Sequence, residues 1–289
     1  MERRVFTGSR SFVVDKRRGF TLIELLVVIA IIALLMAILM PAINLAKMQA
    51  QTVACQVRLK HWSLIFKLYT DDNNGCFHRS AKESGGDHWF NVLRPYYKDN
   101  WGMLVCPTAS RGTDDESELG TFKGFNRTFS MPDGKEKTVP ISYGINSWVT
   151  YQIEDTAGND RPPERFWKSL INAKNANNIP VLGDSTHFDS WCKHYDNPPE
   201  APDVFGIGDQ GNTNDMQQFC INRHNGFINL LFMDWSVRKV GLKELWVLRW
   251  NIEFDINGPW TIAGFGGNRA ACSAAWNTQS PWLRRFPEY

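Results

Sequence analysis

The sequence lacks the short motifs by which several classes of protein are identified. No two cysteines are spaced as C-x-x-C, which argues against zinc ribbons and thioredoxin-type redox sites. The patterns GxSxG, GxxxxGK[ST] and HExxH are also absent. Strand and helix signals do not alternate in a βαβ pattern, which argues against a parallel α/β domain. The sequence therefore predicts that the chain is not an enzyme and needs no cofactor.

A large excess of charge of one sign is missing as well. The 289 residues carry 32 Lys and Arg against 30 Asp and Glu, for a net charge of +2, so the overall charge does not indicate a nucleic-acid partner. The charge is unevenly placed, because residues 1–19 hold six cations and two acids. A basic segment before an apolar run is typical of a targeting segment whose positive end stays in the cytoplasm.

The apolar run covers residues 20–43 and is interrupted only by Thr21, Glu24 and Pro41. As a helix it would be roughly 36 Å long, enough to span a bilayer. An uncleaved signal anchor is the simplest interpretation. A cleavable secretory signal fits less well, because the run is long and does not end in an A-x-A-like site.

Glu24 is the discordant residue in this run. A carboxylate in a membrane helix costs about 2.5 kcal/mol or more near the bilayer centre. A helix N-terminus would offset part of this cost, since its free N–H groups favour an anion. A free amine would offset more. Cleavage after Gly19 would create a free amine at Phe20. Glu24 could then pair with this amine on the same chain or on a neighbouring subunit.

The stretch Lys16-Arg17-Arg18-Gly19-Phe20-Thr21-Leu22-Ile23-Glu24 resembles the signature of type IV prepilins and type II secretion pseudopilins. The resemblance implies cleavage between Gly19 and Phe20 by a prepilin peptidase, followed by N-methylation of Phe20. It also implies roles in processing and filament assembly for Glu24, and it matches Pro41 to a helix-kinking proline often found in pilins.

The pattern after Pro41 predicts that the helix continues to about residue 72. An apolar stripe recurs at helical spacing and is expected to pack against a globular head; its members are Ala46, Ala50, Val53, Val57, Leu64 and Leu68. The predicted fold is α+β, a long N-terminal pilin helix packed on a small, mostly antiparallel sheet. The predicted parts are a leader (1–19), a transmembrane half (20–43), an amphipathic half (44–72) and a head (73–289). Candidate strands are 103–106, 141–145, 180–183, 227–234 and 236–240.

Several head segments resemble a pilin-like subfamily common in Planctomycetes and related bacteria, named for His, nine residues, then Asp-Gly. Here His224 precedes Asp234 by that spacing, but Trp235 replaces the glycine. This departure puts the tight hairpin turn in doubt, because glycine takes positive φ freely. Cys55 and Cys106 also match the subfamily pattern, and the resemblance suggests a disulfide between them, while the other cysteines have no assigned pairing.

Ligand sites in the head are alternatives at this stage. Imidazole and carboxylate groups that could hold a divalent metal occur at Asp184, His187, Asp189, His194, His224 and Asp234. Oxygen ligands for Ca²⁺ could come from Asp203, Asp209 and Asp215. The C-terminal fifth is rich in tryptophan, which could bind a glycan or a protein partner; the residues are Trp246, Trp250, Trp260, Trp276 and Trp282. For each site, ordinary core packing or a solvated loop is the simpler interpretation.

The sequence thus predicts a structural subunit of a type II secretion pseudopilus or a type IV pilus-like fibre. It would sit in the inner membrane as a single-pass protein, with its N-terminus in the cytoplasm and its head in the periplasm or on the surface. Its partners would be prepilin peptidase and other pilin or pseudopilin subunits. The alternative is a membrane-anchored binding protein that uses a pilin-type leader and does not polymerise.

Overall fold

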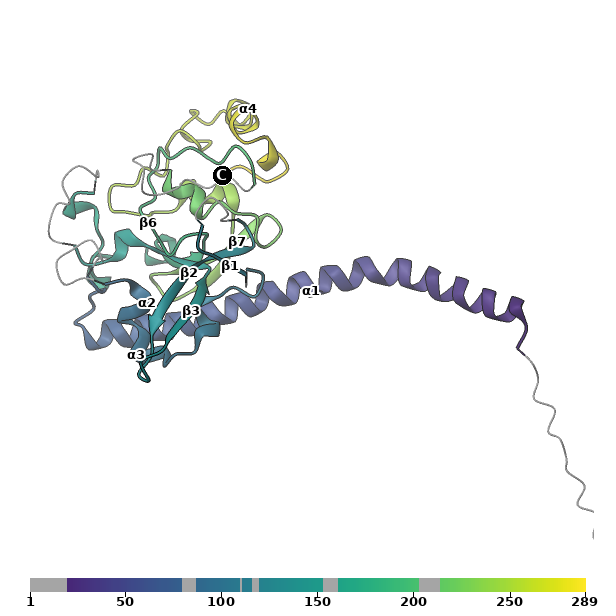
Figure 1. Ribbon diagram of the computed structural model, residues 1–289. Coiled ribbons are helices and arrows are strands. Elements are labelled where there is room, and N and C mark those ends of the chain that lie inside the picture. Colours follow the sequence, from purple (N-terminus) through teal and green to yellow (C-terminus); the bar gives the residue numbers. More distant parts are fainter. Residues whose placement is uncertain (1–19, 80–86, 110, 116–119, 153–160, 203–213) are drawn as a thin grey trace, which may run out of the picture. The chain divides into compact units, whose positions relative to one another are not determined.

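The computed structural model describes residues 20–79, 87–109, 111–115, 120–152, 161–202 and 214–289. The chain divides into two units, Met1–Lys47 and Met48–Tyr289. The helix α1 (Leu22–Asp72) contributes residues to both (Figure 1). The predicted α+β class is confirmed, with a long N-terminal helix and antiparallel-rich sheets in the larger unit.

In the first unit, every described side chain is exposed. An 18-residue window of α1 has a mean hydropathy of 3.2 with none of it buried, and by length and composition the helix can cross a membrane. Leucine, alanine and methionine favour the helix, and the β-branched residues of this run tolerate it. Pro41 lies inside α1, which continues past it.

In the second unit, one face of α1 enters the core. Its centre is Trp62, whose ring packs edge-on against Trp89 and Tyr97 at centroid distances of 5.0 and 5.4 Å. The indole N–H donates to the Met103 carbonyl oxygen over 2.7 Å. The buried face comprises Thr52, Cys55, Leu59, Trp62, Ser63, Ile65, Phe66 and Thr70.

The predicted core stripe of α1 is therefore wrong. Val53, Val57, Leu64 and Leu68 are about half exposed, and Ala46 and Ala50 are exposed too. The helix has two apolar faces, and the head packs on the one that carries the aromatic rings. Burying Trp62 and Phe66 removes more apolar area from water than burying valines and leucines would.

A three-stranded sheet has the order β1-β2-β3, formed by β1 (Arg111–Thr113), β2 (Lys123–Ser130) and β3 (Glu136–Ile141). Strands β1 and β2 are parallel, and β2 and β3 form an antiparallel hairpin. The sequence did not predict β1, β2 or most of β3. The predicted strand at 103–106 is also wrong, because Trp101–Leu104 is a 3₁₀ turn whose carbonyl oxygens accept from Trp62 and from the Ser142 N–H.

A five-stranded sheet has the order β6-β4-β5-β7-β8. Its strands are β4 (Tyr143–Asn146), β5 (Pro180–Asp184), β6 (Asp189–Ser190), β7 (Phe227–Phe232) and β8 (Val237–Gly241). All pairs are antiparallel except β4 with β6. The predicted strand at 141–145 is divided at Ser142, where the chain passes from one sheet to the other.

The β7–β8 hairpin forms as predicted, with its turn at Asp234 and Trp235. Trp235 adopts a φ of 66°, the left-handed value that glycine would take freely. The Asp234 carboxylate accepts hydrogen bonds from the Ser236 N–H and hydroxyl at 2.9 and 2.6 Å, which fixes the turn. The carbonyl oxygen of Trp235 accepts from the Lys60 ammonium over 2.9 Å, so α1 also holds this turn.

The remaining helical elements are short. They are α2 (Trp89–Val92), α3 (Arg94–Tyr97) and α4 (Arg269–Gln279), together with 3₁₀ turns. Trp246 lies in one such turn (Leu242–Val247), and Trp250 follows it. Both are buried, and their indole N–H groups donate to the carbonyl oxygens of Asp196 and Leu245.

Candidate functional site

The first candidate site is the start of α1. Thr21 precedes the helix, and its backbone N–H and hydroxyl both donate to the Glu24 carboxylate at 2.9 Å. The Glu24 N–H in turn donates to the Thr21 hydroxyl over 3.2 Å. This reciprocal pair is a capping box. Each of the two side chains therefore satisfies the other residue's backbone N–H at the start of the helix, and the signal for this in the sequence is the spacing Thr-x-x-Glu.

The processing residues can be placed only in part. Phe20 is 68% exposed. Lys16, Arg17, Arg18 and Gly19 lie outside the described residues, and their predicted roles stay predictions.

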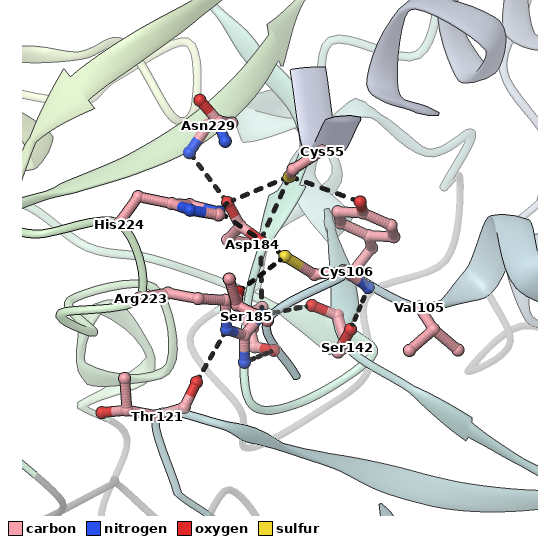
Figure 2. Close-up of polar contacts among 12 residues, drawn as sticks. Cys55, Val105, Cys106, Thr121, Ser142, Asp184, Ser185, Arg223, His224 and Asn229 are labelled. Atoms are coloured by element: carbon pink, nitrogen blue, oxygen red, sulfur yellow. Dashed lines mark hydrogen bonds and ion pairs between the residues drawn. The ribbon is translucent and has the colours of Figure 1, made fainter. Parts of the chain in front are cut away.

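The second candidate site is a buried cluster in the larger unit (Figure 2). Cys55, Cys106, Asp184 and His224 each present one ligand-type atom, and these atoms all lie within 4.8 Å of one another. All four residues are buried. They come from four segments that are distant in sequence: α1, the loop after Leu104, the last residue of β5 and the turn before β7.

Local structure explains how these four side chains converge. The Cys106 N–H donates to the Ser142 hydroxyl over 2.6 Å, where the chain crosses between the sheets. A Cβ at Gly183 would lie 2.8 Å from the Asn229 carbonyl oxygen, so only glycine allows β5 and β7 to approach this closely. The Asn229 N–H donates to Asp184 Oδ2 over 2.9 Å, and the His224 N–H donates to the Phe227 carbonyl oxygen over 3.1 Å.

The distances within the cluster are short and similar. Cys55 Sγ lies 3.5 Å from both carboxylate oxygens of Asp184. His224 Nε2 lies 3.1 Å from Asp184 Oδ2 and 3.5 Å from Cys106 Sγ. The other ring nitrogen, Nδ1, lies 3.2 Å from the Thr52 hydroxyl.

Neighbouring groups set the ionisation of the cluster. Burial opposes ionisation of Asp184, yet His224 and Arg223 hold its pKa down at about 2. Burial also disfavours a charged His224, but the attraction to Asp184 raises its pKa to about 9. Burial raises the pKa of the Cys55 thiol, whereas hydrogen bonds from Cys55 and His224 outweigh burial at Cys106 and lower its pKa to about 6.

Arg223 supports the cluster from one side. Its guanidinium lies 3.4 Å from Asp184 Oδ1 and is fully buried. It also donates to the backbone carbonyl oxygens of Thr121, Ser142 and Ser185 at 2.6–3.0 Å. A buried cation is stable only when it is paired and hydrogen-bonded in this way. The cluster therefore lies within a fixed polar network that joins both sheets.

The structure brings Cys55 and Cys106 together, as the predicted disulfide requires, but both are free thiols, as are the other cysteines, Cys76, Cys192, Cys220 and Cys272. The structure thus has a close thiol pair where the disulfide was predicted, and Asp184, Tyr143 and His224 also contact the two sulfurs. The Tyr143 hydroxyl donates to Cys55 Sγ over 3.3 Å.

The metal candidates from the sequence divide into separate groups. Asp184 and His224 join the cluster, whereas Asp234 lies at the opposite end of β7 and caps the hairpin turn. His187 pairs with Asp189 over 3.0 Å, and His194 packs edge-on against the rings of Tyr195 and Phe254. The sequence alone did not indicate that the two cysteines would supply the other donors.

The remaining candidates are placed as follows. Asp203 and Asp209 lie outside the described residues, so the calcium hypothesis stays a prediction. Asp215 is 3% exposed, and its Oδ2 accepts from the Trp191 N–H over 3.1 Å. Trp276 is buried like Trp246 and Trp250, while Trp260 and Trp282 are partly buried against the core.

Comparison with known proteins bears on the N-terminal segment. Residues 15–40 match the family model of the prokaryotic N-terminal methylation motif. No curated protein and no solved structure matches the chain. The matched segment contains the capped start of α1 and most of its exposed apolar run. The chain therefore carries the prokaryotic N-terminal methylation motif, consistent with a type IV prepilin-like protein.

Proposed function

We propose that this chain is a structural, non-enzymatic subunit of a type II secretion pseudopilus or a type IV pilus-like fibre. The observation that carries the proposal is the exposed apolar part of α1, most of which lies within the methylation motif. Its side chains from Leu22 to Lys47 are all exposed. Exposed apolar surface of this extent is typical of a segment that lies in lipid or against other helices.

The outer face of the second half of α1 supports the same role. Val53, Val57, Leu64 and Leu68 are 49–55% exposed and fall within one narrow stripe at 100° per residue. The head does not cover this stripe. Neighbouring subunits packed along α1 would bury this stripe. Before assembly, the precursor would lie in the inner membrane and would be cleaved by prepilin peptidase.

The alternative is a membrane-anchored binding protein that does not polymerise. Its main support in the sequence was the group of C-terminal tryptophans. Trp246, Trp250 and Trp276 are at most 1% exposed, so these rings are parts of the core and are not free to stack on a glycan. We therefore favour the fibre subunit.

The role of Glu24 gives a direct test. In the proposed fibre, its carboxylate pairs with the Phe20 ammonium of a neighbouring subunit. Glu24→Ala and Glu24→Gln should then both abolish incorporation into sheared fibres while leaving the protein in the membrane fraction. Glutamine is the informative variant, because it keeps the capping box with Thr21 but lacks the charge.

Thr21→Ala is the matched control, since it removes the cap partner and keeps the carboxylate. We expect it to incorporate almost normally, with a loss of helix stability of about 1 kcal/mol. Normal incorporation of Glu24→Ala would contradict the fibre role. Normal incorporation of Glu24→Gln alone would show that capping, and not charge, is what the fibre requires.

A further inference from the structure

We propose that Cys55, Cys106, Asp184 and His224 form a structural zinc site that fastens the second half of α1 to the five-stranded sheet. The proposal is independent of fibre assembly, because every ligand belongs to the unit Met48–Tyr289.

Three of the six distances between donors match a tetrahedral zinc centre, and all six lie within 4.8 Å. Zinc binds sulfur at about 2.3 Å and nitrogen or oxygen at about 2.0–2.1 Å, so tetrahedral geometry requires S–O and S–N separations of about 3.5 Å and an N–O separation of about 3.3 Å. The cluster shows 3.5 Å for Cys55 Sγ to Asp184, 3.5 Å for Cys106 Sγ to His224 Nε2 and 3.1 Å for Nε2 to Asp184 Oδ2. Two sulfurs, one imidazole and one carboxylate are donors that zinc accepts.

The histidine is oriented as a ligand and not as a member of a catalytic triad. In a triad, the two ring nitrogens face different partners, the nucleophile and the carboxylate. Here the same nitrogen, Nε2, faces both Cys106 and Asp184. The cluster is also fully buried, which suits a closed structural metal site and offers no route for a substrate.

The second ring nitrogen has the partner that a metal-bound histidine needs. The Thr52 hydroxyl donates to the Met48 carbonyl oxygen over 2.9 Å, so its oxygen accepts from the Nδ1–H of His224 over 3.2 Å. This hydrogen bond places the proton of a neutral imidazole on Nδ1 and directs the lone pair of Nε2 at the cluster. Such outer partners fix the tautomer and orientation of metal ligands.

The charges also balance when zinc is bound. Two thiolates and the Asp184 carboxylate bring three negative charges, while Zn²⁺ and Arg223 bring three positive ones. All ligands must be deprotonated to bind zinc, so the protons of the Cys55 thiol and of the His224 imidazolium leave to solvent as the metal binds. A buried site that is neutral overall avoids the cost of an uncompensated interior charge. Arg223 therefore serves as a counter-ion for a ligand set with one negative charge in excess.

Metal content tests the proposal. The full chain, purified in detergent from cells grown with zinc, should contain about one zinc per chain by elemental mass spectrometry. Cys106→Ser and His224→Ala should lose it. Cys76→Ser and Cys220→Ala should keep it, because neither thiol belongs to the cluster. Cobalt substituted into the wild-type chain should give thiolate-to-cobalt charge-transfer bands and strong visible bands of a tetrahedral site.

The metal content and thiol alkylation of the wild-type chain test the zinc site even if a ligand variant fails to fold. A chain without metal, in which Cys55 and Cys106 resist alkylation until they are reduced, would overturn the zinc site in favour of a disulfide. A chain without metal whose two thiols alkylate on unfolding would overturn it as well. Zinc retained at full occupancy by a folded double variant, Cys55→Ser with Cys106→Ser, would place the metal elsewhere and also contradict the proposal.

Discussion

The two halves of α1 are continuous in the helix but differ in their surroundings. From Leu22 to Lys47 every side chain is exposed, whereas from Met48 to Asp72 one face is buried in the head. The buried face is not purely apolar, since it includes Thr52 and Ser63. Hydrophobicity alone therefore does not mark the part of the helix that joins the protein core. The exposed half is long and apolar enough to cross a membrane.

The largest effect on head stability is expected at the centre of the buried face. Trp62→Ala removes a buried ring and its hydrogen bond to Met103, and should lower the free energy of unfolding by about 3–5 kcal/mol. Denaturant unfolding of the full chain in detergent, followed by tryptophan fluorescence, measures this. Met36→Ala in the exposed half is the control and should leave the transition unchanged. An equal loss of unfolding free energy in Trp62→Ala and Met36→Ala would contradict the conclusion that only the second half of α1 packs in the core.

A smaller effect is expected at the support of the zinc site. Thr52→Val removes the partner of His224 Nδ1 and should weaken zinc binding by about 10–100-fold. Competition with a chelator of known affinity measures the change. Val53→Thr is adjacent but faces away from the core, and it should leave zinc affinity unaltered. Unchanged affinity in Thr52→Val would argue that the hydrogen bond does not support a metal ligand.

The smallest effect on stability is expected on the outer stripe. Leu64→Glu should change the free energy of unfolding by less than about 0.5 kcal/mol, because the side chain is 54% exposed. The same substitution should reduce incorporation into fibres, since it would place a charge between packed helices. Ile171→Glu, at an 86% exposed position outside α1, is the control. Normal incorporation of Leu64→Glu would exclude the stripe from the fibre contacts.

Much of the fold could be predicted from local patterns. The extent of α1 follows from its apolar period and from the turn residues after Asp72, and the β7–β8 hairpin follows from its apolar strand. The face of α1 that packs on the head could not be predicted, because both faces carry apolar side chains at helical spacing. The β2–β3 hairpin was missed because its strands are rich in charged and polar residues, although Pro132-Asp133-Gly134 is a turn signal.

The candidate site was predictable only in part. The subfamily pattern paired Cys55 with Cys106, and the structure places them together. The addition of Asp184 and His224 depends on the register of β5 and β7 and on the close approach at Gly183, which no local pattern encodes. The capping role of Glu24 follows from the spacing Thr21-x-x-Glu24, whereas the apolar residues around it in the sequence suggested a role for its charge.

The most direct test of the account is the mature N-terminus, determined by mass spectrometry of protein purified from membranes. We expect the chain to start at N-methylated Phe20, and we expect Gly19→Arg to leave the precursor uncleaved. A mature chain that still starts near Met1 would contradict prepilin processing. The exposed half of α1 would then be an ordinary membrane anchor.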